Sequence, residues 1–417
     1  MKIGLLIAVL TAVFLTGCQE GNQVARDLTP AEFLGDPEYR AISYSGWRSD
    51  ERDNELAPSV EQLKEDFRIM HAMGLRVFRT YNTQDFVQTK RTLAALRELR
   101  EEDPGFEMYV MLGVWVRCHK ARTDEADHQR GDLEFNTTEI ETALGMAAEY
   151  PEFIKIIAVG NEAMVHWQPH HVMPGEILKW VNVLKEARSS GRIPSSVWIT
   201  TSDNWAALGG EIAYHQPDLV ELLKAIDFVS LHTYAFHDSY YYPTFSWAVE
   251  EDESLPLEEQ RLRAVRRAVD HQKAQVKAVK DYMHAHGIEK AIHIGETGWA
   301  TKDDSHYGPE GTNAADEYTS MLFHDAIRKW TDEAGMTCFY FQIFDEPWKS
   351  SSVDGSESHF GLFTVDAKAK PVIWDLVDAG TFEGLTRDGN PITKTFNGDE
   401  AALMQTVTPP VIHKEAH

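Results

Sequence analysis

Two glutamates stand directly after apolar runs that are otherwise typical of buried strands. Glu162 follows Ile154–Val159 by way of a glycine and Asn161, and Glu296 follows Ala291–Ile294 by way of a glycine. Two carboxyl groups that face one another can divide the work of a reaction, since a protonated group donates a proton while an ionised one attacks carbon. Hydrolysis of a glycosidic bond requires this pair of roles. The distance between the groups would decide the stereochemistry, at roughly 5–5.5 Å for retention and roughly 6.5–9.5 Å for inversion.

The elements that must position these glutamates alternate along the chain. Apolar runs of strand length are followed by amphipathic stretches of helix length, which predicts a parallel sheet covered by helices. We expect eight strands: Ala41–Tyr44, Arg76–Thr80, Met108–Val114, Ile154–Val159, Val197–Thr201, Phe228–Leu231, Ala291–Ile294 and Cys338–Phe344. The expected helices include Val60–Met73, Lys90–Glu101, Glu139–Tyr150, Ile177–Ser189, Gln260–His286 and Asn313–Glu333. Eight such units indicate an α/β fold, a closed (β/α)₈ TIM barrel. An open doubly wound sheet lacks its main support, because no glycine-rich fingerprint follows the first strand.

Polar residues just past the strands are the candidates for a site, because catalytic groups of such barrels lie at the carboxyl ends of strands. This rule selects Arg79, Tyr81, Trp115, Asn161, Glu162, Ser202 to Trp205, His232, Tyr234, Glu296, Asp345 and Glu346. Two long loops, Arg117–Asn136 and Phe236–Glu259, follow the third and sixth strands, and the second is rich in aromatic residues. Loops of this length are typical of the walls of a site.

The motifs around the two glutamates resemble those of glycoside hydrolase family 17, whose members are mostly β-1,3-glucanases and related transglycosylases on a (β/α)₈ barrel. The resemblance extends from about Arg40 to Trp374. It rests on Val159–Glu162, Gly295–Trp299, Phe344–Lys349, Phe360–Phe363 and the early stretches Tyr44-Ser45, Leu63–Asp66 and Met73–Tyr81.

The resemblance implies roles for individual residues. Glu162 would be the general acid/base and Glu296 the nucleophile, which implies retention. Asn161 would donate a hydrogen bond to the hydroxyl beside the reacting carbon, and Tyr234 would orient Glu296. Further residues expected at the substrate are Arg79, Tyr81, Trp115, Trp299, Glu346 and Lys349. For Arg79, a charge partner beneath the carboxylates and a purely structural role both stay open.

Composition limits the partners of the chain. Its 417 residues carry 40 Lys and Arg against 66 Asp and Glu, a net charge of −26. A polyanion would be repelled, so no nucleic acid is expected and a neutral polysaccharide is favoured. Trp115, Trp205, Trp299 and Trp348 could present apolar faces to sugar rings. No cofactor is expected, and no metal, because Pro169 interrupts the group His166, His170 and His171 and no HExxH frame exists.

The N-terminus has the pattern of an exported lipoprotein. An uncharged apolar run, Ile3–Thr16, is too short to span a membrane and ends in Leu15–Cys18, which resembles a bacterial lipobox. We expect a signal peptide over 1–17, lipid on Cys18, and attachment to the cell envelope, at the outer membrane in a Gram-negative host. This peptide would be followed by a linker over 18–37, a catalytic domain over 38–381 and a C-terminal extension over 382–417. The extension is expected to hold a short strand pair. Cys118 and Cys338 are expected to be buried free thiols.

The resemblance therefore implies a retaining hydrolase of β-1,3-glucan such as laminarin, which we expect to be a monomer and to be endo-acting. Two alternatives stay open. A β-1,3-glucan glucanosyltransferase would use the same carboxylates, and a surface glycan-binding lipoprotein would have lost turnover.

Overall fold

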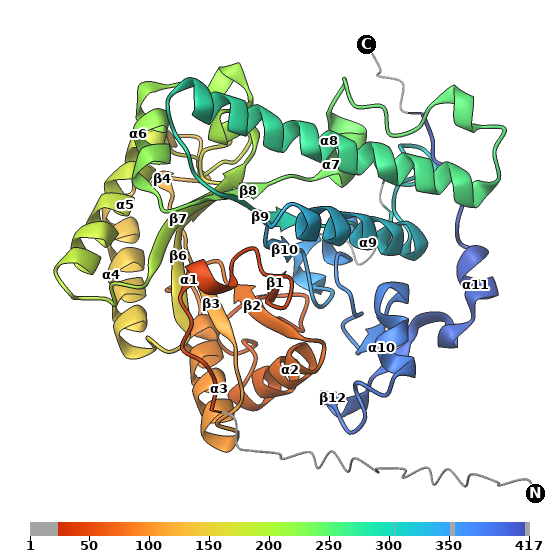
Figure 1. The fold of residues 1–417 in the computed structure, drawn as a ribbon, viewed down its shortest axis with the longest axis horizontal. Coiled ribbons are helices and arrows are strands. Elements are labelled where there is room, and N and C mark those ends of the chain that lie inside the picture. Colours follow the sequence, from red (N-terminus) through yellow and green to blue (C-terminus); the bar gives the residue numbers. More distant parts are fainter. Residues whose placement is uncertain (1–23, 304, 351–354, 413–417) are drawn as a thin grey trace, which may run out of the picture.

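The chain folds into the closed eight-stranded parallel barrel that the sequence predicts (Figure 1). The computed structural model describes residues 24–303, 305–350 and 355–412. The barrel strands are β1 (Arg40–Ser43), β2 (Leu75–Arg79), β3 (Tyr109–Val114), β6 (Ile154–Asn161), β7 (Trp198–Asn204), β8 (Val229–His232), β9 (Ile292–Thr297) and β10 (Cys338–Tyr340). Their order round the barrel is β1-β10-β9-β8-β7-β6-β3-β2, so each strand pairs with its neighbours in the barrel sequence. The predicted fold class is confirmed.

Helices follow the strands and surround the barrel. They are α2 (Val60–Ala72), α3 (Gln88–Glu102), α4 (Leu133–Glu149), α5 (Pro174–Ser189), α6 (Pro217–Ala225), α8 (Leu257–Ala285) and α9 (Glu317–Glu333). The helix α2 illustrates how the sequence sets their limits: Ser59 and Gln62 form a reciprocal capping box at its start, and Gly74, at φ +79°, follows its end. Its buried residues, which include Leu63, Phe67 and Met70, face the barrel.

Several predicted boundaries differ from the observed ones. The helix α4 begins six residues before the predicted Glu139, because the Asp132 side chain accepts a hydrogen bond from the Phe135 amide and caps it there. In the same way Asp316 caps α9, which begins at Glu317 and not at Asn313. The last barrel strand ends at Tyr340, four residues earlier than predicted. The eight strand positions are otherwise confirmed.

The two ends of the barrel differ in chemistry. Inside the barrel, Val77, Tyr109, Met111 and Phe339 form an apolar cluster with Phe33 of the short helix α1 (Pro30–Phe33). The rings of Phe33 and Tyr109 stack at 5.1 Å between centroids. This cluster fills the end of the barrel where the strands begin. Polar side chains are therefore left to the opposite end, where the strands finish.

The segments outside the barrel repeat carry further small elements. The loop after β3 holds a hairpin of β4 (Cys118–His119) and β5 (Asp127–Gly131), and α7 (Ala235–Tyr241) follows β8. Towards the C-terminus lie α10 (Trp374–Asp378), β11 (Lys368–Ala369), β14 (Thr393–Lys394), α11 (Glu400–Met404) and an antiparallel pair of β12 (Thr386–Arg387) and β13 (Asn390–Pro391). The strand pair expected in the C-terminal extension is thus present.

The predictions for cysteine and for the N-terminus have different outcomes. Cys118 and Cys338 are both buried and unpaired, as predicted. Cys18 and the apolar run before it lie outside the described residues. Within the described part of the chain, no helix has the length and apolar character needed to cross a membrane.

Candidate active site

The structure brings Glu162 and Glu296 together at the carboxyl end of the barrel. Glu296 lies within β9, and Glu162 is the first residue after β6. The backbone of Glu162 has φ +46°, a conformation that few residues with side chains adopt, and its amide donates a hydrogen bond to the Ser202 carbonyl at 3.0 Å. One carboxylate oxygen of each glutamate and a ring nitrogen of His232 lie within 4.8 Å of one another.

Glu296 is held by two neighbouring side chains. The Tyr234 hydroxyl donates a hydrogen bond to Oε2 at 2.9 Å, and Nη1 of Arg79 lies 3.2 Å from Oε1. Burial opposes the charge of this carboxylate. The electrostatic influence of His232, Arg79 and Lys349 and the hydrogen bond from Tyr234 outweigh burial, so the pKa of Glu296 lies below its usual value. Glu296 is therefore ionised at neutral pH.

Arg79 is fully buried and connects its own strand, β2, to the four strands β6, β7, β8 and β9. Its Nη1 donates to the Ser202 hydroxyl and the Gly295 carbonyl, both at 2.9 Å, and Nη2 donates to Oδ1 of Asn161 at 2.7 Å. Because Oδ1 is the acceptor here, the amide nitrogen of Asn161 keeps its two protons for a ligand. Of the two roles left open for Arg79, the geometry matches the charge partner. The expected contact of Arg79 with the substrate is wrong, because this buried side chain lines neither cavity beside the glutamates.

His232 links the two glutamates and was not among the site residues predicted from the resemblance. Its Nε2 lies 2.9 Å from Nη1 of Arg79, which can only donate, so Nε2 is the acceptor. In the neutral ring, Nδ1 then carries the proton and faces Oε1 of Glu162 at 3.2 Å and Oε2 of Glu296 at 3.6 Å. The position of His232 at the end of β8 was the only signal in the sequence.

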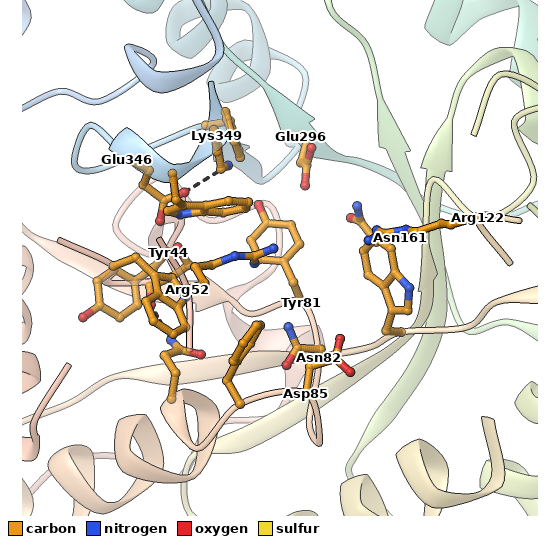
Figure 2. Close-up of a pocket in the computed structure, with 17 residues that line it drawn as sticks. Tyr44, Arg52, Tyr81, Asn82, Asp85, Arg122, Asn161, Glu296, Glu346 and Lys349 are labelled. Carbon is orange, nitrogen blue, oxygen red and sulfur yellow. Dashed lines mark hydrogen bonds and ion pairs between the residues drawn. The ribbon is translucent and has the colours of Figure 1, made fainter. Parts of the chain in front are cut away.

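A cavity of about 370 Å³ opens on the Glu296 side, and we call it the Glu296 pocket (Figure 2). The predicted residues Tyr81, Trp115, Asn161, Glu346 and Lys349 all line it. Lys349 pairs with Glu346 at 3.0 Å. Its remaining walls include Tyr44, Ser45, Trp47, Arg52, Asn82, Asp85, Phe86, Gln88, Arg122, Phe341 and Trp348.

Glu139, which the sequence did not single out, fixes one wall of the Glu296 pocket. Its buried carboxylate accepts hydrogen bonds from the amides of Thr83 at 2.6 Å, Trp115 at 3.0 Å and Gln84 at 3.2 Å. One side chain of α4 therefore joins the loops that follow β2 and β3. Burial raises the pKa of Glu139 to about 7 against the effect of these donors.

A second cavity, of about 490 Å³, lies on the other side of the carboxylates, and we call it the Glu162 pocket. Tyr234, Trp205 and Asn204 line it together with Trp167 and Tyr241. The last two side chains are exposed, at 60% and 63% of their surface. Exposed aromatic faces beside a carboxylate are well suited to stacking on sugar rings.

The prediction that Trp299 contacts the substrate is wrong. Its ring is fully buried, contacts Trp247 and Phe323, and donates through Nε1 to the Ala314 carbonyl at 2.9 Å. It therefore belongs to the core around α9 and has no face free for a substrate. Of the other predicted tryptophans, Trp115 and Trp348 line the Glu296 pocket and Trp205 lines the Glu162 pocket.

The trio Glu162, His232 and Glu296 is also the one group of the described residues whose ligand atoms are close enough to hold a metal ion. The alternative candidate in the sequence does not have this geometry. His170 is buried against Trp115, and Nδ1 of His171 faces the Gln168 carbonyl at 2.8 Å. A metal, if one bound, would therefore have to occupy the space between the two glutamates.

The barrel and its paired glutamates define a protein of the glycoside hydrolase class. Comparison with known families agrees, since residues 41–361 match the BtgE/BtgC glycoside hydrolase domain. The chain belongs to this family of glycoside hydrolases. The predicted recognition of a β-1,3-glucanase-like glycoside hydrolase is confirmed.

Three relatives illustrate the similarity. An endo-laminarinase from Formosa Hel1_33_131 has 48% sequence identity and a TM-score of 0.90, over 94% of this chain and 99% of its own. A glucan 1,3-beta-glucosidase of Arthroderma benhamiae is 24% identical over 74% of this chain and 82% of its own length. A glycoside hydrolase family 17 β-1,3-glucanosyltransferase from Rhizomucor miehei, 18% identical over 80% of this chain and 96% of its own, shares the fold with a TM-score of 0.54.

Proposed function

We propose that the protein is an endo-acting hydrolase that cleaves β-1,3-glucan with retention, using Glu296 as nucleophile and Glu162 as general acid/base. The observation that carries this proposal is the separation of the two carboxylates, whose nearest oxygens lie within 4.8 Å. Retaining enzymes have a separation of roughly 5–5.5 Å, which leaves no room for a water molecule between the carboxylate and the sugar. The substrate is inferred from the endo-laminarinase and the glucan 1,3-beta-glucosidase that the chain resembles.

In the first step, Glu296 attacks the anomeric carbon. Oε2 accepts a hydrogen bond from Tyr234, whereas Oε1 is held by the charge of Arg79 at 3.2 Å, so we assign the attack to Oε1. Glu162 gives its proton to the leaving oxygen, and a covalent glycosyl–enzyme intermediate forms. The amide of Asn161 is placed to hydrogen-bond the neighbouring sugar hydroxyl.

In the second step, Glu162 takes a proton from water, which attacks the intermediate and releases Glu296. The Glu162 side chain is 19% exposed, against 7% for Glu296, so water can approach from its side. The Nδ1 proton of His232 stabilises the negative charge that alternates between the two carboxylates. The same geometry would allow a sugar to replace water, which is the glucanosyltransferase alternative.

Endo action is supported by the position of the cavities. The Glu296 pocket and the Glu162 pocket lie on opposite sides of the reacting groups, so a glucan chain can occupy both. A neutral polymer also suits a chain with a net charge of −26, because its binding needs no electrostatic attraction.

The test is to incubate the protein lacking residues 1–18 with laminarin and with a short β-1,3-gluco-oligosaccharide, and to size the products over time. We expect a range of shorter products from laminarin, and a β-configured reducing end in the first product by NMR. Products longer than the starting oligosaccharide would establish transfer. Binding of both substrates without turnover would contradict hydrolysis and favour the glycan-binding alternative.

We further propose that the protein is a monomer attached to the cell envelope by lipid on Cys18. The Leu15–Cys18 sequence supports this attachment. The Cys18→Ser protein should leave the membrane fraction of expressing cells and enter the aqueous phase of a detergent partition. Unchanged partition would contradict the anchor. Light scattering on the chain without residues 1–18 should give the mass of one chain.

A further inference from the structure

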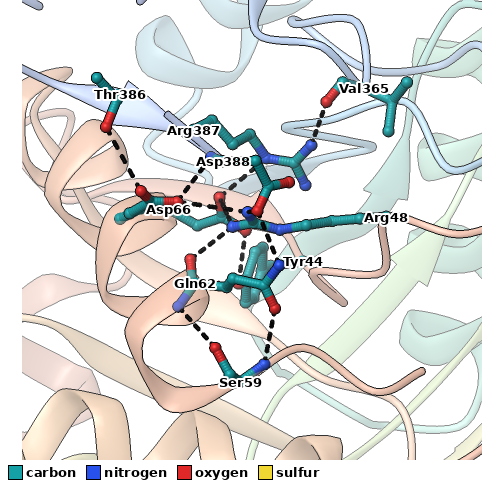
Figure 3. Close-up of polar contacts among 10 residues, drawn as sticks. Tyr44, Arg48, Ser59, Gln62, Asp66, Val365, Thr386, Arg387 and Asp388 are labelled. Carbon is teal, nitrogen blue, oxygen red and sulfur yellow. Dashed lines mark hydrogen bonds and ion pairs between the residues drawn. The ribbon is translucent and has the colours of Figure 1, made fainter. Parts of the chain in front are cut away.

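A buried carboxylate on the outside of the barrel joins three distant segments of the chain (Figure 3). Asp66 of α2 has no exposed surface. Its Oδ2 accepts a hydrogen bond from the Tyr44 hydroxyl at 3.0 Å, and its Oδ1 accepts one from Nη2 of Arg48 at 2.8 Å and one from Nε of Arg387 at 2.9 Å. Arg387 lies in β12, 321 residues further along the chain. We call these four residues the Asp66 cluster.

Residues 365–388, which we call the C-terminal segment, supply further partners to the Asp66 cluster. Arg48 also forms ion pairs with Glu65 and Asp388, and Nη1 of Arg387 donates to the Val365 carbonyl at 2.5 Å. The guanidinium of Arg387 also lies 4.0 Å from the centre of the Phe344 ring. Burying charges is costly unless each has its partners, and loss of one partner leaves an uncompensated charge. The hairpin β12–β13 is therefore held against α2 and the loop that precedes it.

Through Tyr44, Asp66 also holds the loop between β1 and α2, and this loop forms a wall of the Glu296 pocket. Tyr44, Ser45, Trp47 and Arg52, all in the loop between β1 and α2, line this pocket. The loop turns back at Gly46, where φ is +79° and a Cβ atom would lie 2.6 Å from the Tyr44 hydroxyl. The path of the loop thus depends on where the Tyr44 hydroxyl is held, and Asp66 holds it.

We propose that Arg387 and Asp66 are positioning residues for the sugar-binding wall formed by the β1–α2 loop. The C-terminal segment then contributes to the affinity for the glucosyl units on the Glu296 side, although none of its described residues lines that pocket. The identity of the sugar rests on the proposed function. The ordering of the loop does not.

The test compares Arg387→Met with a matched variant, Arg261→Met. Arg261 is equally buried and pairs with Asp316 at 3.1 Å, but neither residue lines either pocket. In Arg387→Met, we expect KM for a β-1,3-gluco-oligosaccharide of six units to rise about fivefold while kcat changes less than about twofold, because binding common to ground and transition states is lost. The backbone amides of 45–52 should exchange with deuterium about tenfold faster. Arg261→Met should change neither quantity.

Unchanged KM and unchanged exchange in a folded Arg387→Met protein would overturn the proposal, as would equal changes in Arg261→Met. If Arg387→Met does not fold, Asp388→Ala takes its place, since this variant removes one ion-pair partner of Arg48 and leaves Arg387 in position. We expect smaller changes of the same kind in KM and in exchange. If the exchange of 45–52 is not faster in Asp388→Ala, the proposal is overturned. Arg387→Lys should restore part of the affinity. If the unmutated protein does not cleave β-1,3-glucan, the proposed function fails, whereas the exchange measurement still decides whether Arg387 orders the loop.

Discussion

The two sides of the cleft are built differently. On the Glu296 side, the reacting carboxylate is nearly enclosed and held by Tyr234 and Arg79, and buried carboxylates outside the pocket fix its walls. On the Glu162 side, the carboxylate is partly exposed, lies 3.2 Å from Nδ1 of His232, and adjoins the exposed rings of Trp167 and Tyr241. The retaining reaction proposed above would account for the contrast, because the sugar on one side would stay bound through both steps whereas the group on the other would leave and be replaced by water.

The strongest test of this contrast is Glu296→Ala. Without the nucleophile, kcat on laminarin should fall by a factor on the order of 10⁴ or more, with the fold intact by circular dichroism. Azide supplied with an activated aryl glucoside should then give a product of inverted configuration at the anomeric carbon. The matched variant Glu162→Ala should give the retained configuration. The opposite assignment of products would exchange the roles of the two glutamates.

Glu162→Gln tests the exposed side. A general acid contributes about 10²- to 10⁴-fold, so turnover of laminarin should fall by this factor. A substrate with a dinitrophenolate leaving group needs no proton, and its glycosylation rate should fall much less. Equal losses for both substrates in single-turnover kinetics would exclude Glu162 as the acid.

Tyr234→Phe tests the hydrogen bond that the Tyr234 hydroxyl donates to Glu296. Loss of a hydrogen bond to a charged group, about 1.5 kcal/mol, should lower kcat about tenfold. The active form of Glu296 is ionised and its pKa lies below the usual 4.5, so activity is present above that pH and is lost as pH falls through the lowered pKa. Without the Tyr234 hydroxyl, the acidic limb of kcat/KM should move to higher pH. A lower kcat with an unmoved limb would show that Tyr234 acts in another way.

The barrel and the meeting of Glu162 with Glu296 could be predicted because both depend on local pattern. An apolar run that ends in a carboxylate marks the end of a strand, and the parallel order of strands then places Glu162 beside Glu296. Trp299 could not be placed in this way. The chain turns at Gly298, where a Cβ would lie 2.0 Å from the Phe341 carbonyl oxygen, and directs the next side chain away from the cleft into the core. The direction of a residue beyond a strand end depends on such contacts and not on periodicity.

The polar contacts between distant segments are the other feature of the site that could not be predicted from the sequence. Nothing local in the hairpin 386–391 indicates that Arg387 meets Asp66, and Glu139 lies on a helix whose carboxylates are mostly exposed. The roles of Asp66 and Glu139 can be recognised only in the folded barrel, where each carboxylate meets its partners. They share one property, which is that each buried carboxylate holds loops that form the Glu296 pocket. The more enclosed side of the cleft is thus the side whose walls are held by contacts between distant segments.

Trp167→Ala tests the open side of the cleft, with Ile212→Ala as an exposed apolar control outside both pockets. A stacked aromatic contributes about 1 kcal/mol, so KM for long oligosaccharides should rise about fivefold. The melting temperature should not change, because the ring is exposed. Transfer to added oligosaccharide acceptors should fall relative to hydrolysis, since the acceptor occupies this side. No change in KM or in product ratio would remove Trp167 from the binding surface.

The smallest effect is expected from chelation. The trio Glu162, His232 and Glu296 could coordinate a divalent cation, yet the reaction proposed for the two glutamates needs one proton and one free carboxylate. A cation bound there would compete for Oε1 of Glu296 and for the proton of Glu162, and so would inhibit both sides of the cleft together. Treatment with EDTA should therefore leave kcat unchanged, and added Zn²⁺ should lower it. Activity lost in EDTA and restored by one cation would mean that the metal, and not the difference in enclosure between the two glutamates, divides their roles.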